Sequence, residues 1–309
     1  MFEKILINST TLNHVKWFVQ GDRAACPSLV LLGEKGIGKN LIAKEIAKWF
    51  LELPIGAPPQ VSLDYYEVSP NRDISLKEQV EEMMAFAAYA PNRAKRRVIL
   101  IDEAELVNQG TLLKLLEDQA RTCVFLMVAH RELLSTIYSR SIVMTVTPPS
   151  RKELKDFLAA QNRTPDGLLL LASGGRLGYY EKFQEREEYQ NAMKHFLNVF
   201  NHMEQKRDIL AACGALKEKD PEYFFTAFSQ DEIMGFFHML EAIFQHNLAS
   251  FSGISQELPI AIRSDLPQMY DREATAELLF SLERDKRRLR RNEGYSKNDF
   301  FDLLIKLVE

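Results

Sequence analysis

The chain has 309 residues, a net charge of −4 and three cysteines, Cys26, Cys123 and Cys213. Its length suffices for two or three domains with sizeable cores, and its acidic balance argues against a dominant nucleic-acid surface. The cysteines have neither metal-ligand spacing nor a paired framework, which is typical of a reducing cytosol. With no leader segment and no apolar run of about 18 residues, we expect a cytoplasmic protein without membrane contact.

Residues 1–147 alternate helical patterns with short apolar strands, and this alternation predicts a parallel α/β sheet. The expected strands are 28–32, 65–68, 98–102, 124–128 and 142–147. A loop rich in proline and glycine is expected at 53–59, and Pro148-Pro149 ends the sheet region. The remaining chain is expected to be helical, with its first helices at 151–160 and near 166–172.

The segment 29–39 has the pattern of a strand followed by a phosphate-binding loop. An apolar run leads into Gly-x-x-x-x-Gly-Lys, and a helical pattern follows at once. The glycines let backbone N–H groups point at phosphate oxygens, the helix N-terminus adds partial positive charge, and Lys39 reaches the β- and γ-phosphates. The alternative is a tight strand-to-helix turn. The expected nucleotide-binding residues are Gly33, Gly36, Ile37, Gly38, Lys39, Asn40 and Asp102.

Asn40 stands where this motif normally carries a Ser or Thr hydroxyl that binds Mg²⁺. An amide oxygen is able to contact a cation, but it does so from a longer and differently angled side chain. The site is therefore expected to bind ATP or ADP with Mg²⁺ better than it hydrolyses ATP.

A second motif joins the buried strand 98–101 to two acids, Asp102 and Glu103. A carboxylate at the carboxyl end of such a strand holds Mg²⁺, and its neighbour polarises an attacking water. Asp102 is accordingly predicted as the Mg²⁺-side acid, acting through the nucleotide, and Glu103 as the catalytic base. The alternative is that the two acids only begin the next helix.

Three further segments resemble, in order and spacing, the clamp-loader branch of the AAA+ ATPases. They are Ile101-Asp102-Glu103-Ala104-Glu105, the run Leu-Leu-Lys-Leu-Leu-Glu-Asp at 112–118, and Leu-Leu-Ser-Thr-Ile-Tyr-Ser-Arg-Ser at 133–141. Within that branch the resemblance is closest to the delta-prime class of the bacterial DNA polymerase III clamp loader. It implies an AAA+ P-loop α/β domain over 1–147, a small helical lid over 148–185 and an all-α collar over 186–309.

The resemblance also implies a role for Arg140 in trans. In this family the corresponding arginine points into the ATP site of the neighbouring subunit, where its guanidinium stabilises charge on the transferring phosphate. The implied partners are motor gamma/tau-like and delta-like subunits in a hetero-pentamer, the sliding clamp, and primer–template DNA through the assembly. The implied function is loading of the clamp onto primed DNA as part of the DNA polymerase III holoenzyme.

The sequence departs from the pattern of a working ATPase of this family in several places. The stretch 49–64 has no cysteines, so no zinc is expected. His130 occupies the position of a polar phosphate sensor, although a helix-start or surface histidine is the favoured interpretation. Arg176 is either the second sensor or a solvent-facing cap residue. Together with Asn40, these departures predict that the chain's own ATPase is weak or absent.

Two rival functions stay open. Lys39, Asp102 and Glu103 favour an ATP-hydrolysing motor subunit of the clamp loader, against the altered sensors and the missing zinc module. A stand-alone AAA+ regulator is the second rival.

Two conspicuous segments in the helical part receive structural interpretations. The basic run 284–291 is interpreted as a collar face or subunit contact in preference to a nucleic-acid site. The aromatic residues Tyr223, Phe224, Phe225, Phe228, Phe236 and Phe237 are interpreted as helical core.

Overall fold

The chain divides into two compact units, Met1–Pro149 and Ser150–Glu309. The computed structural model describes residues 5–20, 28–54, 56–118, 122–203, 227–254, 258–291 and 295–308. Cys26, Cys213 and the aromatic residues 223–225 lie outside the described residues. The break after Pro149 follows the two prolines that were expected to end the sheet region. The further division of the helical unit into lid and collar near residue 185 stays a prediction.

The first unit is built on a five-stranded parallel sheet in the order β2-β3-β4-β1-β5. Each expected strand is present within two residues of its predicted ends. The strands are β1 (Ser28–Leu32), β2 (Tyr65–Val68), β3 (Arg97–Ile101), β4 (Cys123–Ala129) and β5 (Ile142–Thr145). The predicted fold class, a P-loop-type parallel α/β sheet followed by a helical part, is confirmed.

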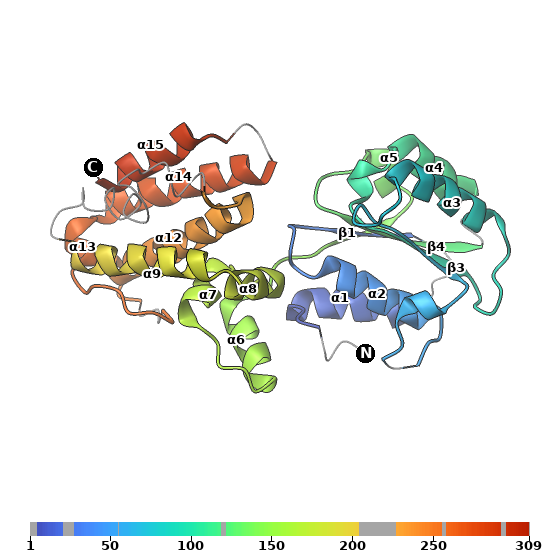
Figure 1. Cartoon of the computed structure of the whole chain (residues 1–309), viewed down its shortest axis with the longest axis horizontal. Coiled ribbons are helices and arrows are strands. Elements are labelled where there is room, and N and C mark those ends of the chain that lie inside the picture. The colour runs from blue at the N-terminus through green and yellow to red at the C-terminus, as the bar shows by residue number, and fades with distance from the viewer. Residues whose placement is uncertain are drawn as a thin grey trace. The chain divides into compact units, whose positions relative to one another are not determined.

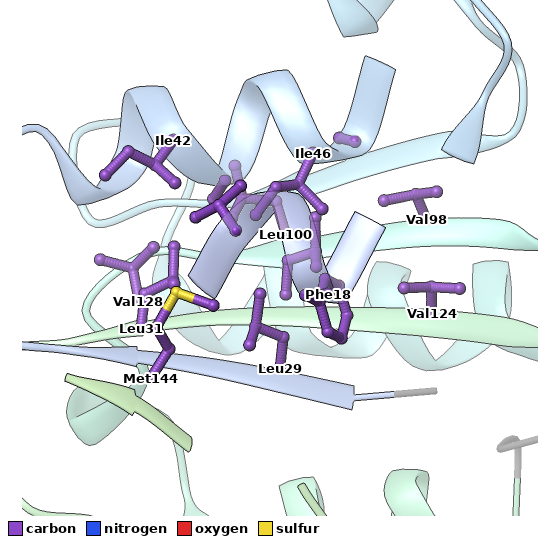
Figure 2. Packing of buried hydrophobic residues seen from close by; sticks show 14 of the residues in the cluster. Phe18, Leu29, Leu31, Ile42, Ile46, Val98, Leu100, Val124, Val128 and Met144 are labelled. Carbon is purple, nitrogen blue, oxygen red and sulfur yellow. The ribbon is translucent and has the colours of Figure 1, made fainter. Parts of the chain in front are cut away.

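Helices cover both faces of this sheet (Figure 1). They are α1 (Ser9–Gln20), α2 (Lys39–Phe50), α3 (Leu76–Ala88), α4 (Gln109–Asp118) and α5 (Ser135–Tyr138), with short 3₁₀ turns η1 (Pro59–Val61) and η2 (Ala104–Leu106). Successive strand residues point to opposite faces, so each apolar strand feeds two cores. Leu29 and Leu31 pack with α1 and α2 (Figure 2). Val30 points to the other face and packs with α3, α4 and α5.

All secondary-structure elements in the described residues of the second unit are helices. Its helices are α6 (Arg151–Ala160), α7 (Gly167–Ala172), α8 (Leu177–Gln184), α9 (Glu187–His202), α12 (Gln230–Phe251), α13 (Leu266–Met269), α14 (Arg272–Arg291) and α15 (Lys297–Val308). The expected helix 151–160 has the bounds of α6, which Ser150 and Glu153 begin with a capping box. Phe228, Phe236 and Phe237 are buried, which confirms their assignment to the core.

The basic run 284–291 lies on α14 and is occupied by ion pairs within its own unit. Lys286 is buried and pairs with Glu241 at 2.8 Å and with Glu283 at 3.2 Å. Arg288 pairs with Asp299 of α15. These contacts favour the structural interpretation of the run over nucleic-acid binding.

None of the helices formed by the described residues is both long enough and apolar enough to span a bilayer.

Gly33 has a close backbone neighbour that leaves no room for a side chain. A Cβ at this position would lie 2.3 Å from the carbonyl oxygen of Val146, whose own N–H donates to Leu32. We therefore expect Gly33→Ala to lower the free energy of unfolding of the α/β unit by about 1–3 kcal/mol, measured by denaturant titration. The control is Gly110→Ala in α4, where a Cβ would meet only the Asn108 side chain and which should cause no loss. Equal stability of the two variants would contradict this account.

Candidate nucleotide-binding site

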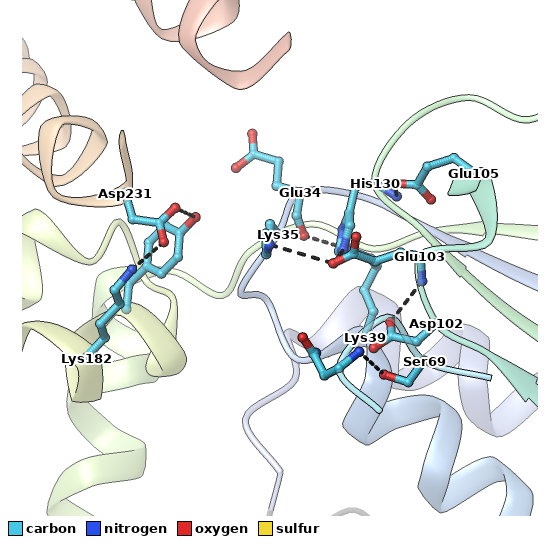
Figure 3. Close-up of polar contacts among 12 residues, drawn as sticks. Glu34, Lys35, Lys39, Ser69, Asp102, Glu103, Glu105, His130, Lys182 and Asp231 are labelled. Atoms are coloured by element: carbon cyan, nitrogen blue, oxygen red, sulfur yellow. Dashed lines mark hydrogen bonds and ion pairs between the residues drawn. The ribbon is translucent and has the colours of Figure 1, made fainter. Parts of the chain in front are cut away.

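The candidate site lies at the carboxyl edge of the sheet. Strands β3, β4 and β1 are parallel neighbours, so the segments that follow them emerge side by side. The glycine-rich loop follows β1, Asp102 follows β3 and His130 follows β4. The sheet order therefore brings together residues that lie far apart in the sequence (Figure 3).

The glycine-rich loop has a backbone path that its glycines permit. Gly36 and Gly38 have φ values of 80° and 85°, in the left-handed region that residues with a Cβ rarely adopt. Gly38 is the N-cap of α2, so the free N–H groups and partial positive charge of this helix begin at the loop. The buried Ile37 packs into the core beneath and fixes the loop to the sheet. This backbone fits a phosphate group.

Lys39 is the first residue of α2 and is only 3% exposed. Its Nζ donates to the carbonyl oxygens of Gly33 at 2.6 Å and Glu34 at 2.5 Å, and lies 2.8 Å from Nδ1 of His130. Burial lowers the pKa of Lys39 to about 8, against the opposing effect of the neighbouring acids, first of all Glu105. At neutral pH the ammonium is therefore largely charged and fully surrounded by acceptors.

His130 belongs to this site. Burial, and then the nearby Lys39 ammonium, lower its pKa to about 4, so the imidazole is neutral at pH 7. Because Nδ1 accepts from Lys39, we assign the proton to Nε2, which lies 3.8 Å from Oε1 of Glu103. The favoured sequence interpretation, a helix-start or surface histidine, is wrong, because the β4 strand delivers this side chain to the buried lysine.

The acids of the second motif lie beside these groups. Oδ1 of Asp102 accepts the backbone N–H of Glu103 at 3.1 Å. Glu103 has a left-handed backbone, with φ of 50°, and its Oε1 lies 3.7 Å from Nζ of Lys35. A non-glycine residue in this conformation costs about 1 kcal/mol or more, which the surrounding structure has to offset.

Glu105 also belongs to the site, although the sequence analysis did not predict it as a site residue. Its Oε1 accepts the backbone N–H of His130 at 3.1 Å, while its Oε2 is buried without a hydrogen-bond partner among the described residues. Its position in the segment Asp102-Glu103-Ala104-Glu105, directly after β3, was the sequence feature that could have indicated this role. A 3₁₀ turn after the strand brings its side chain back to the sheet edge.

The groups present fit a nucleotide with its cation. A magnesium ion bound with a nucleotide is usually held by one or two carboxylates, phosphate oxygens and water, and Asp102 would supply such a carboxylate. The Asn40 amide is half-buried on the first turn of α2, and no described residue hydrogen-bonds to it. Among the described residues, no cluster of three or more His, Cys, Asp or Glu side chains is placed to hold a metal alone. The absence of zinc from the whole chain stays a prediction.

Arg140 lies at the opposite, amino edge of the sheet. Its carbonyl oxygen accepts the hydroxyl of Ser28, the buried first residue of β1, at 2.5 Å. Its side chain is 42% exposed and pairs with Glu117 of α4 at 2.8 Å. The length of β1 therefore separates Arg140 from the glycine-rich loop of its own chain.

Arg176 belongs to the helical unit. It is the N-cap residue of α8, but its side chain is buried, 3.2 Å from Nε2 of His238 on α12 and over the ring of Tyr179. Burial lowers the pKa of Arg176 to about 10. Arg176 is therefore a cap residue, but the expectation that it faces solvent is wrong. A sensor role for Arg176 stays a prediction.

Comparison with known proteins finds sequence similarity that includes the α/β unit. Residues 8–150 match the family model described as "DNA polymerase III, delta subunit". The chain is 25% identical to the DNA polymerase III subunit gamma of Buchnera aphidicola over 56% of its length, and 26% identical to the subunit delta′ of Pseudomonas aeruginosa over 46%. Residues 8–150, nearly the whole α/β unit, are therefore similar to DNA polymerase III subunits named gamma, delta and delta′. The chain spans about half the length of the curated relatives that it matches.

Solved structures give a weaker likeness over nearly the whole chain. A DNA polymerase III gamma subunit-related protein from Thermotoga maritima aligns with 96% of this chain and 98% of its own, at 15% identity and a TM-score of 0.46. The DNA clamp loader delta protein of Bacillus subtilis aligns with 96% and 99%, at 13% identity and a TM-score of 0.37. The similarity to DNA polymerase III subunits therefore depends on the sequence matches.

The low pKa of His130 is open to direct measurement. We expect Lys39→Met to raise the pKa of His130 from about 4, because a neighbouring positive charge is lost, but to leave it below 6.5, because the burial remains. Histidine NMR titrations of wild type and Lys39→Met test this expectation. The control is Lys44→Met, which removes the ion pair of Lys44 with Glu67 and should leave the pKa of His130 unchanged.

The same shift predicts how stability depends on pH. The folded-state pKa of His130 lies below the unfolded value of 6.5, so the unfolded chain binds the proton first. Its contribution to stability is complete above pH 6.5 and is lost progressively as the pH falls toward 4. A wild-type His130 that titrates near 6.5 would contradict both expectations.

Proposed function

We propose that this chain is a delta-prime-like subunit of the replicative clamp loader of DNA polymerase III. It would help to load the sliding clamp onto primed DNA and would supply Arg140 to the ATP site of the neighbouring motor subunit. Its own ATPase would be weak or absent. Similarity to the gamma and delta′ subunits of DNA polymerase III supports the assembly, and the position of Arg140 supports the division of roles.

The observation that carries this proposal is the placement of Arg140 at the sheet edge opposite to its own phosphate loop. The five residues of β1 begin at Ser28, which binds the Arg140 backbone, and extend over about 16 Å of strand to the first loop glycine, Gly33. An arginine side chain does not span that distance around the sheet. If Arg140 acts on a phosphate, that phosphate therefore belongs to another molecule.

The local structure suits an arginine finger, that is, an arginine that reaches into the ATP site of a neighbouring subunit. The hydrogen bonds from Ser28 to the Arg140 carbonyl and from the Arg140 N–H to Ile137 fix the backbone. The side chain is 42% exposed, and its guanidinium also donates to the carbonyl oxygen of Thr136 and to the hydroxyl of Ser139. The exposed ion pair with Glu117 contributes only about 0–1 kcal/mol. A γ-phosphate with several negative oxygens would compete well with one exposed carboxylate for the guanidinium.

The chain's own site supports binding more than turnover. The position of Lys39, Asp102 and Glu103 at one sheet edge supports binding of ATP or ADP with Mg²⁺, but Asn40 replaces the hydroxyl ligand. The bound nucleotide would therefore be structural in this subunit.

The assembly implied is a cytoplasmic hetero-pentamer. The helical unit, with its lid over 148–185 and collar over 186–309, would join motor gamma/tau-like and delta-like subunits. The sliding clamp and primer–template DNA would be partners of the whole assembly. The acidic net charge of −4 is in keeping with DNA contact through a local surface.

The test is the DNA- and clamp-stimulated ATPase of a reconstituted loader that contains this chain as wild type or Arg140→Ala. We expect hydrolysis at the neighbouring site to fall by about 10³-fold, with the complex still assembled, because the transition-state charge loses its guanidinium. Arg140→Lys should restore little of the lost ATPase rate, because an ammonium lacks the planar geometry with which a guanidinium binds two phosphate oxygens at once. Arg93→Ala, which removes another exposed arginine of the same unit, is the matched control.

Unchanged turnover with Arg140→Ala would overturn the trans role. The rival motor function is favoured by the convergence of Lys39, Asp102 and Glu103 at one edge, and rapid hydrolysis by the purified chain would support it. The absence of any stable complex with clamp-loader subunits would favour the stand-alone regulator instead.

A further inference from the structure

We infer that His130 acts as an internal substitute for phosphate, holding Lys39 in a bond that an incoming nucleotide must break. The inference rests on the nucleotide-binding half of the proposed function and adds a regulatory element to that site. On this inference His130 positions Lys39 and lowers the affinity of the site for nucleotide. A phosphate sensor would do the opposite, because it would bind the phosphate and raise that affinity.

The hydrogen bonds of Lys39 carry the inference. A lysine ammonium has three N–H donors and no acceptor. In this chain Nζ lies within 2.8 Å of the carbonyl oxygens of Gly33 and Glu34 and of Nδ1 of His130, which accepts in the Nε2–H tautomer assigned above. The side chain is buried, so water does not offer an easy fourth partner. A phosphate oxygen therefore gains a hydrogen bond from Lys39 only by displacing one of these acceptors.

His130 is the acceptor best placed to be displaced. The carbonyl oxygens of Gly33 and Glu34 are part of the phosphate loop itself, whose N–H groups would surround the same phosphate. His130 comes from a different strand, β4, and its backbone is fixed separately by Glu105. A charged phosphate oxygen is a stronger acceptor for an ammonium than a neutral imidazole nitrogen. Binding would therefore exchange the imidazole for phosphate.

Two models of His130 predict opposite effects of its removal. If it holds Lys39 back, loss of its nitrogen acceptor frees one N–H donor and tightens binding. If it donates its Nε2–H to the γ-phosphate, the same change weakens binding. The sign of the change in affinity for ATP therefore separates the two models.

The experiment is calorimetric titration of the full chain with ATP and Mg²⁺, using wild type, His130→Leu and His130→Gln. Leucine fills much of the space without an acceptor, whereas the glutamine amide oxygen is still able to accept from Lys39. We expect His130→Leu to bind ATP about tenfold more tightly than wild type, as the release of one charge-assisted hydrogen bond implies. His130→Gln should bind with nearly wild-type affinity.

Equal or weaker binding by a folded His130→Leu variant would overturn the inference, and so would a failure of both wild type and this variant to bind ATP. Should the leucine variant not fold, ¹⁵N NMR of wild-type His130 at pH 7 decides. An Nε2–H tautomer whose Nδ1 signal shifts on addition of ATP supports the inference, and a protonated or Nδ1–H ring overturns it. None of these outcomes affects the Arg140 experiment, which uses the neighbouring subunit's site.

Discussion

The parallel alignment of β3, β4 and β1 is the constraint on which the rest of the α/β unit depends. Hydrogen bonds between these three neighbouring strands bring their carboxyl ends to one edge of the sheet. The glycine-rich loop, the acids Asp102 and Glu103, and His130 each follow one of these strands and therefore lie close together. Alternating apolar side chains on each strand bury both faces of the sheet and hold that alignment. The chemistry of the site follows from the order of the strands.

The same strands also separate two functions in space. The carboxyl edge carries the lysine and acids suited to a nucleotide, while the amino edge carries an arginine held by Ser28. A sheet about 16 Å deep keeps these groups apart within one chain, whereas subunits packed edge to edge would bring them together. On our proposal, this polarity lets a subunit with a weak site of its own still contribute to hydrolysis next to it.

The sequence predicted the strands, the glycine-rich loop and the helical second unit well, because apolar alternation and glycine spacing are local patterns. It failed for His130 and Arg176, whose surroundings depend on contacts between distant segments. His130 meets Lys39 only because β4 lies beside β1, and Arg176 is buried by His238 on α12. Glu105 was visible in a motif, but its bond to His130 across the sheet edge was not.

On our proposal, this subunit contributes to hydrolysis in trans and needs no turnover of its own. The most direct measurement is the stimulated ATPase of the reconstituted loader when only this chain carries Glu103→Gln, which removes the expected catalytic base and keeps its size. Our account predicts turnover equal to that of the wild-type assembly. A collapse of turnover, with the complex intact, would show that the chain's own site is a working motor and would contradict the account.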